Sequence, residues 1–315
     1  LGQSGHNATF AVACALVHGF ALSESDALAI PQEYNGRCSP AWSERELVHK
    51  IKSVATARHD KPRGHLLGDK AQRYSSPAPM KPTPAPKIDP ANAVENFLKG
   101  FRCTPADLIA VSTCKIPPLI CERHFHRQGA YLIDQLFEPG ERVNIVTRAI
   151  VDGDKARPGD AGLTLDRNEW EGRLLEPMTA QPGGAWLRMN PLDGNGVADA
   201  NVTAFRFALI EIDCVPVELQ LALLARLKLP IAAILTSGGK SAHAWVKVGA
   251  DTADDYRATV SKLLDVLARF GVDGKNKNPS RLSRLPGAIR TIGASGDGKQ
   301  RLLYLNPDPK QEAIL

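Results

Sequence analysis

Two acidic residues close an apolar stretch in the second half of the chain, AFRFALIEID at 204–213. Because side chains alternate between the two faces of a strand, Glu211 and Asp213 are expected on one face, with their Cα atoms roughly 6.5 Å apart. Carboxylates this close repel each other unless a cation or a proton lies between them. Two Mg²⁺ or Mn²⁺ ions about 3.5 to 4 Å apart would neutralise both acids and activate an attacking oxygen in phosphoryl transfer. The alternative is that the two acids mark the exposed end of an edge strand.

A hydroxyl and an imidazole follow in TSGGKSAHAWVKV, residues 236–248. Its Gly-Lys-Ser looks like the end of a Walker phosphate-binding loop, but that loop requires a glycine five positions before its Gly-Lys pair, where this chain has Ile234. The alternation that follows predicts instead a strand with Ser241 and His243 on one face. The two glycines before it predict a hairpin turn from the preceding strand. Two such side chains together can bind phosphate oxygens.

A basic segment, DGKNKNPSRLSRLPGAIR, supplies the third group of candidate residues. Residues 271–301 hold seven Lys or Arg and two Asp, so their net charge of 7 − 2 = +5 equals that of the whole chain. Arg281 and Arg284 lie three residues apart and can converge on one anion, since guanidinium groups pair well with phosphate oxygens. The alternative is a solvated basic loop.

In this order the three motifs resemble those of the archaeo-eukaryotic primase superfamily, in particular the primase-polymerases of bacterial plasmids, phages and integrated elements. The family's first motif, two acids one residue apart on a strand, is matched by Glu211-Ile212-Asp213. Its second motif, Ser-x-His on a later strand, is matched by Ser241-Ala242-His243, and its third acid by Asp273. NPSRLSRLPGAIR is similar to the family's arginine-rich segment.

The resemblance implies a DNA-dependent primase-polymerase, a nucleotidyltransferase that joins nucleoside triphosphates on a single-stranded DNA template. It implies that Glu211, Asp213 and Asp273 bind two Mg²⁺ or Mn²⁺ ions. It also implies that His243, with Ser241, contacts the triphosphate of the incoming nucleotide. To these residues we add Lys240, Arg281 and Arg284, because cations are expected to flank a triphosphate. The implied fold is a catalytic core with a sheet like that of the RNA-recognition motif, with accessory strands and helices.

The elements that must position these residues fall into three segments. Residues 1–58 are expected to form a small all-α domain, because Ser43 and Glu46 have the spacing of a capping box ahead of an apolar stripe. Residues 59–93 are expected to form an extended linker, because the stretch 75–90 alone contains six prolines. Residues 94–315 are expected to form the catalytic domain, an α+β fold. Within it we predict strands at 141–151, 185–192 and 204–213, helices at 217–229 and 253–271, and the hairpin described above.

The all-α segment is similar to the helical domain that often follows the catalytic core in these primases, although here it precedes the core. The resemblance implies that this accessory domain binds template or primer. A replicative helicase would act in trans or on another part of a longer chain, because no Walker loop occurs here. Since the sequence begins with Leu1 rather than Met, we expect a fragment of a larger protein.

Composition limits the class of protein. The chain has 315 residues, of which 43% are hydrophobic and 6% aromatic, as in globular proteins. No run approaches the roughly 18 apolar residues of a membrane helix, so no membrane partner is expected. The six cysteines include no Cys-x-x-Cys pair, which favours reduced thiols and a cytoplasmic location.

Two other functions stay open from the residues alone. One is a replication-initiator protein that binds DNA with the same fold but without the chemistry. The other is a rolling-circle nuclease, because His124-Phe125-His126 has the His-hydrophobic-His form of those enzymes and Tyr131 is available as a nucleophile. Cys121 and these histidines, with Cys114 or Cys103, offer zinc ligands, but no Cys-x-x-Cys knuckle is present, so we expect no zinc site.

Overall fold

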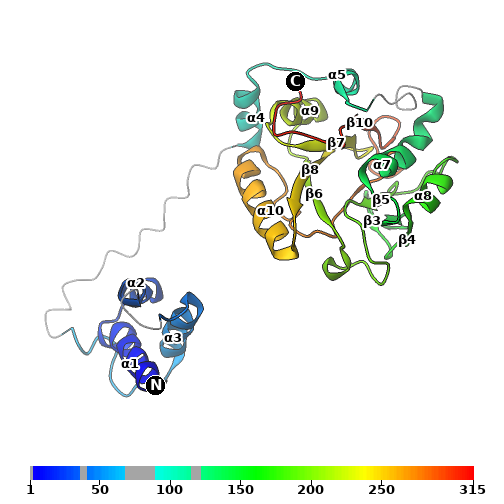
Figure 1. Cartoon of the computed structure of the whole chain (residues 1–315). Coiled ribbons are helices and arrows are strands. Elements are labelled where there is room, and N and C mark those ends of the chain that lie inside the picture. Colours follow the sequence, from blue (N-terminus) through cyan, green and yellow to red (C-terminus); the bar gives the residue numbers. More distant parts are fainter. Residues whose placement is uncertain (1–2, 36–40, 68–88, 115–121) are drawn as a thin grey trace. The chain divides into compact units, whose positions relative to one another are not determined.

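The structure, a computed structural model, describes residues 3–35, 41–67, 89–114 and 122–315 (Figure 1). The chain divides into two compact units, 1–86 and 87–315. No helix in these described ranges is both long enough and apolar enough to span a bilayer.

The first unit is built from helices over its described residues, as predicted. They are α1 (Gln3–Cys14), the π-helical turn η1 (Ala15–Gly19), α2 (Glu24–Asn35) and α3 (Glu44–Thr56). The predicted capping box of Ser43 and Glu46 opens α3: each side chain binds the backbone N–H of the other residue. Behind this cap, Ile51 and Val54 pack against the other helices in a small apolar core.

Both described ends of the predicted linker differ from an extended chain. Near its start, Gly64 N donates to His18 O at 2.7 Å and Leu66 N donates to Gly19 O at 2.9 Å, so residues 59–67 fold back onto the helical unit. Near its end, α4 (Pro90–Leu98) begins, with Asp89 as its cap, and packs into the core of the second unit. At the second of these ends the prediction of an extended chain failed because proline is also favoured in the first turn of a helix, where Pro90 lies. The rest of the predicted linker, 68–88, lies outside the described residues.

The second unit is an α+β fold with two four-stranded antiparallel sheets. The first sheet has the order β10-β7-β8-β6, with β6 (Phe205–Ile212), β7 (Ile231–Thr236), β8 (Ala242–Ala250) and β10 (Leu302–Leu305). Helices α9 (Val217–Arg226) and α10 (Ala253–Leu267) complete the order β6-α9-β7-β8-α10-β10. Along the chain this is the βαββαβ order of an RNA-recognition-motif-like core, with one strand of the other sheet, Leu282–Arg284, inserted before β10. Within the sheet, β6 lies at one edge.

The second sheet has the order β4-β1-β5-β9. Its strands are β1 (Arg142–Val146), β4 (Leu163–Asp166), β5 (Trp186–Arg188) and β9 (Leu282–Arg284). The hairpin β2 (Ala149–Asp152) and β3 (Lys155–Pro158) forms a separate two-stranded sheet. Further helices are α5 (Pro105–Val111), η3 (Glu122–Arg127), α7 (Gln128–Leu136), α8 (Arg167–Arg173), η4 (Asp199–Asn201) and η5 (Ala268–Phe270).

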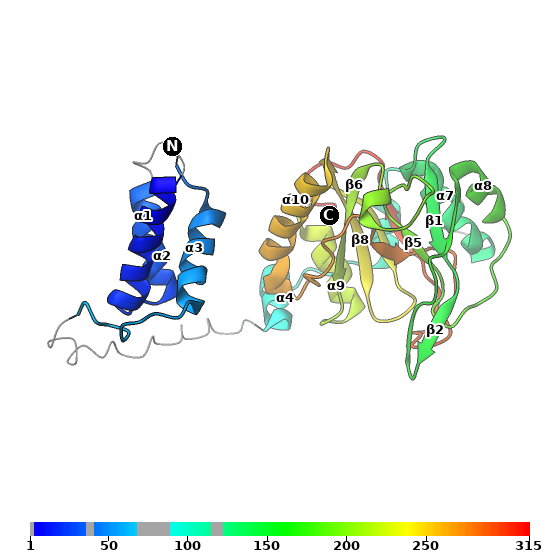
Figure 2. The same cartoon turned by 90° about the horizontal axis from the view of Figure 1, so that it is seen from below.

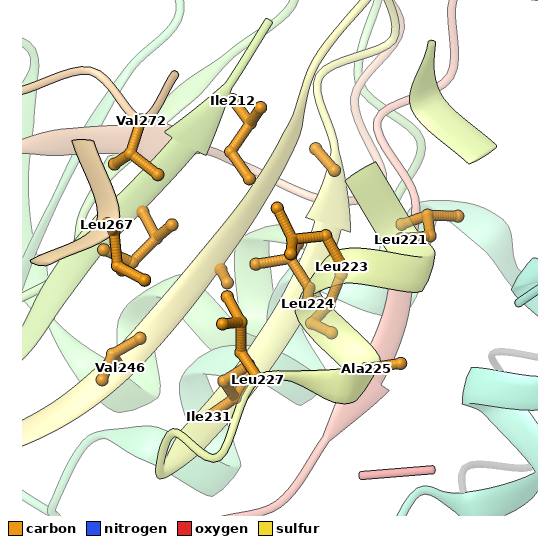
Figure 3. Packing of buried hydrophobic residues seen from close by; sticks show 14 of the residues in the cluster. Ile212, Leu221, Leu223, Leu224, Ala225, Leu227, Ile231, Val246, Leu267 and Val272 are labelled. Atoms are coloured by element: carbon orange, nitrogen blue, oxygen red, sulfur yellow. The ribbon is translucent and has the colours of Figure 1, made fainter. Parts of the chain in front are cut away.

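The first sheet is buried on both faces (Figure 2). Ile212 of β6 and Val246 of β8 pack against α9, α10 and the segment around Val272 (Figure 3). The opposite face, with Leu209 and Trp245, packs against the second sheet and α7 and α8. The predicted alternation is therefore confirmed from Phe207 to Ile212 of β6 and from Ala242 to Val246 of β8, and Glu211 and His243 lie on the face that meets the second sheet. At the start of β6 a register shift places Phe205 in the opposite core.

Candidate active site

The acid and the imidazole predicted from two separate motifs are direct neighbours. Strands β6 and β8 pair so that Glu211 lies opposite His243, and both side chains are on the face that meets the second sheet. Asp213 follows the last residue of β6 and is exposed. The antiparallel register thus converts a separation of 32 residues (243 − 211) into one cross-strand pair.

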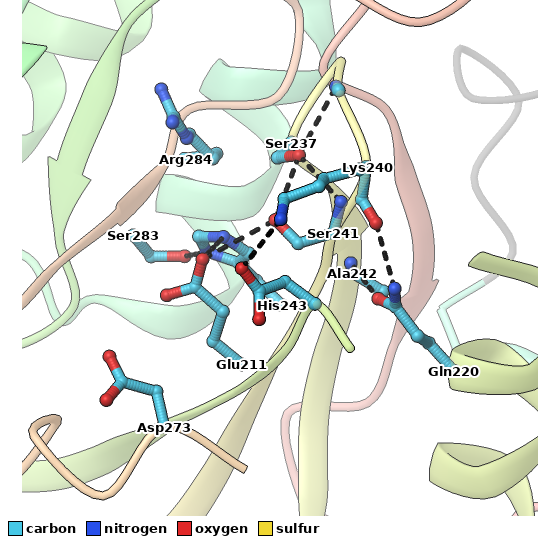
Figure 4. A network of polar contacts seen from close by, with 12 residues as sticks. Glu211, Gln220, Ser237, Lys240, Ser241, Ala242, His243, Asp273, Ser283 and Arg284 are labelled. Carbon is cyan, nitrogen blue, oxygen red and sulfur yellow. Dashed lines mark hydrogen bonds and ion pairs between the residues drawn. The ribbon is translucent and has the colours of Figure 1, made fainter. Parts of the chain in front are cut away.

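His243 is buried, with 4% of its surface exposed. Its Nε2 lies 3.4 Å from Glu211 Oε1, yet that nitrogen has no hydrogen-bond partner among the described residues. Its Nδ1 lies 3.1 Å from Ser283 Oγ (Figure 4). The second sheet thus holds one ring nitrogen, and the other faces the carboxylate.

The predicted hairpin turn joins β7 to β8 and presents Ser241 beside Glu211. Ser241 Oγ lies 3.4 Å from Glu211 Oε1 as a donor and 3.1 Å from Ser237 Oγ. Gln220 of α9 clamps the turn, since its Nε2 donates to Lys240 O at 2.8 Å and its Oε1 accepts from Ala242 N at 2.6 Å. The glycines make the turn, as the sequence suggested, and Gly238 has a φ of +67°.

Asp273 reaches the site through the backbone. Its N–H donates to Glu211 O at 3.0 Å, next to an antiparallel bridge between Ile212 and Val272. Its Oδ2 lies 3.8 Å from Arg281 Nη2, while Asp213 Oδ2 lies 3.1 Å from Lys240 Nζ. The three predicted acids are therefore on adjoining backbone, and each carboxylate faces a cationic or imidazole group.

A pocket of about 370 Å³ opens beside Glu211 and His243. Its lining residues are Pro158, Trp186, Arg188, Glu211, His243, Asn278, Ser280, Arg281, Leu282 and Arg284. With His243 neutral, three arginines against one glutamate give the lining a charge of 3 − 1 = +2. A concave site of this sign suits a polyanionic ligand.

Arg188 contributes a charge that the sequence reasoning missed. It is 9% exposed, and its guanidinium donates to Val197 O and Asn144 Oδ1, both at 3.3 Å and both neutral. Burial lowers the pKa of Arg188. A buried cation without an opposite charge is costly, so an anion in the pocket would stabilise it. The available signal was a lone arginine inside the apolar stretch AWLRM.

The charges around the pocket control two pKa values. Burial by itself raises the pKa of Glu211, but the contact with His243 and the charges of Arg284 and Arg281 outweigh it and lower that pKa to about 2. Burial, together with the neighbouring charge of Arg290, lowers the pKa of Arg284 to about 10. At neutral pH the glutamate is therefore an anion and the arginine still a cation.

Whether Glu211, Asp213 and Asp273 can bind divalent metals depends on the types of ligand atoms and on where the backbone places them. Carboxylate oxygens are the ligands that Mg²⁺ and Mn²⁺ prefer, and the backbone brings all three acids to one end of β6. Across the described ranges, however, no three His, Cys, Asp or Glu side chains are close enough to hold an ion together. The residues fit the metals in type and in backbone position, while their side chains face Lys240, Arg281 and His243.

The histidines of the nuclease alternative lie in η3, away from these acids in the sequence. The rings of His124 and His126 have centroids 6.4 Å apart and tilted planes, and no third metal ligand joins them within the described segments. Burial and the nearby Cys114 raise the pKa of Tyr131 to about 12. Cys121, which suggested zinc, is outside the described residues.

Comparison with known proteins gives two solved structures. One is the AEP domain of a primase-polymerase from cyanophage S-2L, with 18% identity, a TM-score of 0.37, and coverage of 57% of this chain and 90% of that chain. The other is the catalytic domain of primase Repb′ in complex with initiator DNA, with 16% identity, a TM-score of 0.40, and coverage of 58% and 88%. No protein-family model and no curated protein matches the chain. At such scores, only the chain's own residues can support an assignment of its chemistry.

Proposed function

We propose that residues 87–315 are a DNA-dependent primase-polymerase, a nucleotidyltransferase that extends a primer or an initiating nucleotide on single-stranded DNA. One observation carries the proposal: Glu211 and His243 are a cross-strand pair on the wall of a pocket that also has three arginines. The order of the acidic, Ser-x-His and arginine-rich motifs supports the same family of enzymes.

Within the proposal, different residues of the pocket and its turn contact different parts of a nucleoside triphosphate. Arg281 and Arg284 bind phosphate oxygens, and Arg188 compensates further negative charge. The Nε2 atom of His243, which has no hydrogen-bond partner among the described residues, donates to a phosphate oxygen. Lys240 and Ser241 lie on the turn whose backbone Gln220 holds by two hydrogen bonds. This backbone is therefore already ordered before the triphosphate binds. Together these groups hold the triphosphate still while the reaction proceeds.

Glu211, Asp213 and Asp273 would hold Mg²⁺ or Mn²⁺, which when bound neutralise phosphate charge and activate the attacking hydroxyl. The overall reaction joins that hydroxyl oxygen to the α-phosphorus and releases pyrophosphate. Within the proposal, the helical unit binds template or primer, a replicative helicase acts alongside, and the enzyme works in the cytoplasm.

The test is incorporation of labelled nucleotides on single-stranded DNA with Mg²⁺ or Mn²⁺, with and without chelator. We expect product from the wild type, loss of at least about a hundredfold in Glu211→Gln and Asp213→Asn, and full activity in Glu95→Gln, an exposed control on α4. DNA binding without any product would show a non-catalytic initiator protein. Nicking that disappears in Tyr131→Phe would show the nuclease, and either result would refute the polymerase.

A further inference from the structure

A buried chain of three polar side chains connects the two sheets behind the candidate site. Trp245 of β8 donates its indole N–H to Ser283 Oγ of β9 at 2.9 Å, and the same oxygen lies 3.1 Å from His243 Nδ1. Trp245 and Ser283 are both fully buried. No substrate group can reach this serine from solvent, so its role concerns the residues it contacts.

The donors and acceptors of this chain can be assigned from their chemistry. An indole N–H can only donate, so Ser283 Oγ accepts from Trp245. The hydroxyl proton of Ser283 then needs an acceptor, because a buried donor left unpaired costs about 1–3 kcal/mol. His243 Nδ1 is its acceptor among the described residues. In the neutral ring, Nδ1 is therefore bare and the proton is on Nε2.

The Nε2 atom is on the pocket side of the ring. It is buried, has no hydrogen-bond partner in the described parts of the chain, and lies 3.4 Å from Glu211 Oε1 in the wall of the pocket. A donor held in this way suits an anionic oxygen. Without Ser283, the ring could turn over or carry its proton on Nδ1, and the pocket would lose this donor.

We propose that Ser283, oriented by Trp245, is a positioning residue that fixes the ring orientation and the Nε2–H tautomer of His243, so that this histidine donates to a phosphate oxygen of the nucleotide. The contact between His243 and a nucleotide phosphate rests on the proposed function, whereas the assignment of the Nε2–H tautomer does not. The same short strand supplies Arg284 to the pocket, so one segment both binds the anion and orients the imidazole.

The tautomer is measured by long-range ¹H–¹⁵N spectra of the His243 ring in the full chain, at alkaline pH and without nucleotide. We expect a pyrrole-type Nε2 and a pyridine-type Nδ1 in the wild type. Both nitrogen shifts should move toward averaged values in Ser283→Ala and in Trp245→Phe, and Ser283→Thr should restore the wild-type pattern. Ser112→Ala, which removes another buried serine hydroxyl, is the control and should leave the ring unchanged. A proton on Nδ1 in the wild type, or an unchanged ring in Ser283→Ala, would overturn the proposal.

The second measurement is binding of a non-hydrolysable nucleoside triphosphate by calorimetry. Ser283→Ala should weaken binding about five- to tenfold, the order expected for one hydrogen bond, with Ser283→Thr close to the wild type. Wild-type binding that Ser283→Ala leaves unchanged refutes the positioning role. A wild type that binds no nucleotide refutes the proposed function instead, and the ring spectra then still decide the tautomer.

Discussion

Glu211→Gln is the substitution whose effect on stability follows most directly from the geometry. The glutamine keeps the shape of the side chain but removes the one carboxylate in the lining of the pocket. Arg281 and Arg284 then lose their nearest opposite charge in that lining, and His243 Nε2 loses the carboxylate 3.4 Å away. We expect the variant to fold and to be less stable at neutral pH.

The size of the loss follows from the pKa of Glu211. Its ordinary value is 4.5 and its value in the folded protein is about 2, a difference that corresponds to about 3 kcal/mol of stability at neutral pH. Because the folded pKa is depressed, this contribution is complete above pH 4.5 and is lost as the pH falls toward 2. Near pH 3 about 1 kcal/mol remains. The side chain is 28% exposed, so these are upper values.

The assay is urea unfolding of the wild type and Glu211→Gln in chelator, from pH 7 down to pH 3. The difference in unfolding free energy should be about 2–3 kcal/mol at pH 7 and should shrink below pH 4.5. Glu95→Gln, an exposed residue of α4, should match the wild type at every pH. A difference that stays constant with pH would mean that lost packing, not lost charge, destabilises the variant, and the electrostatic reasoning would be refuted.

Two further outcomes follow from the same structure. Arg188→Met should weaken binding of inorganic triphosphate about tenfold or more, yet leave the unfolding free energy equal to or up to about 2 kcal/mol above the wild type, because it removes a buried charge that has only neutral partners among the described residues. Normal binding with lower stability would contradict this prediction. Arg148→Met, at an exposed arginine, is the control. Gly238→Ala should lower stability by about 1–2 kcal/mol or more in urea unfolding, because φ is +67° and a Cβ would lie 2.3 Å from Gly298 O. Gly172→Ala in α8, where a Cβ meets open space, should not, and equal behaviour of the two variants would refute the strain argument.

The sequence determined those features that depend on local periodicity and turn chemistry. Alternation in β6 and β8 placed Glu211 and His243 on the correct face, and the two glycines predicted the turn between β7 and β8 that carries Ser241. The capping box of α3 was likewise predictable from the spacing of Ser43 and Glu46. These signals are local because a side chain's face depends only on its position in a strand or helix.

Only the tertiary structure decided which distant residues share the pocket. Asp273 joins the acids through a backbone hydrogen bond to Glu211, and Arg188 enters from the other sheet as a buried charge. Ser283 reaches His243 because β9 packs across β8, with one hydroxyl placed between an indole and an imidazole. Such contacts depend on strand order, register and the packing of two sheets, which no short stretch of sequence specifies. The sequence thus predicted which types of chemical group are present, whereas only the tertiary structure showed that they converge on one pocket.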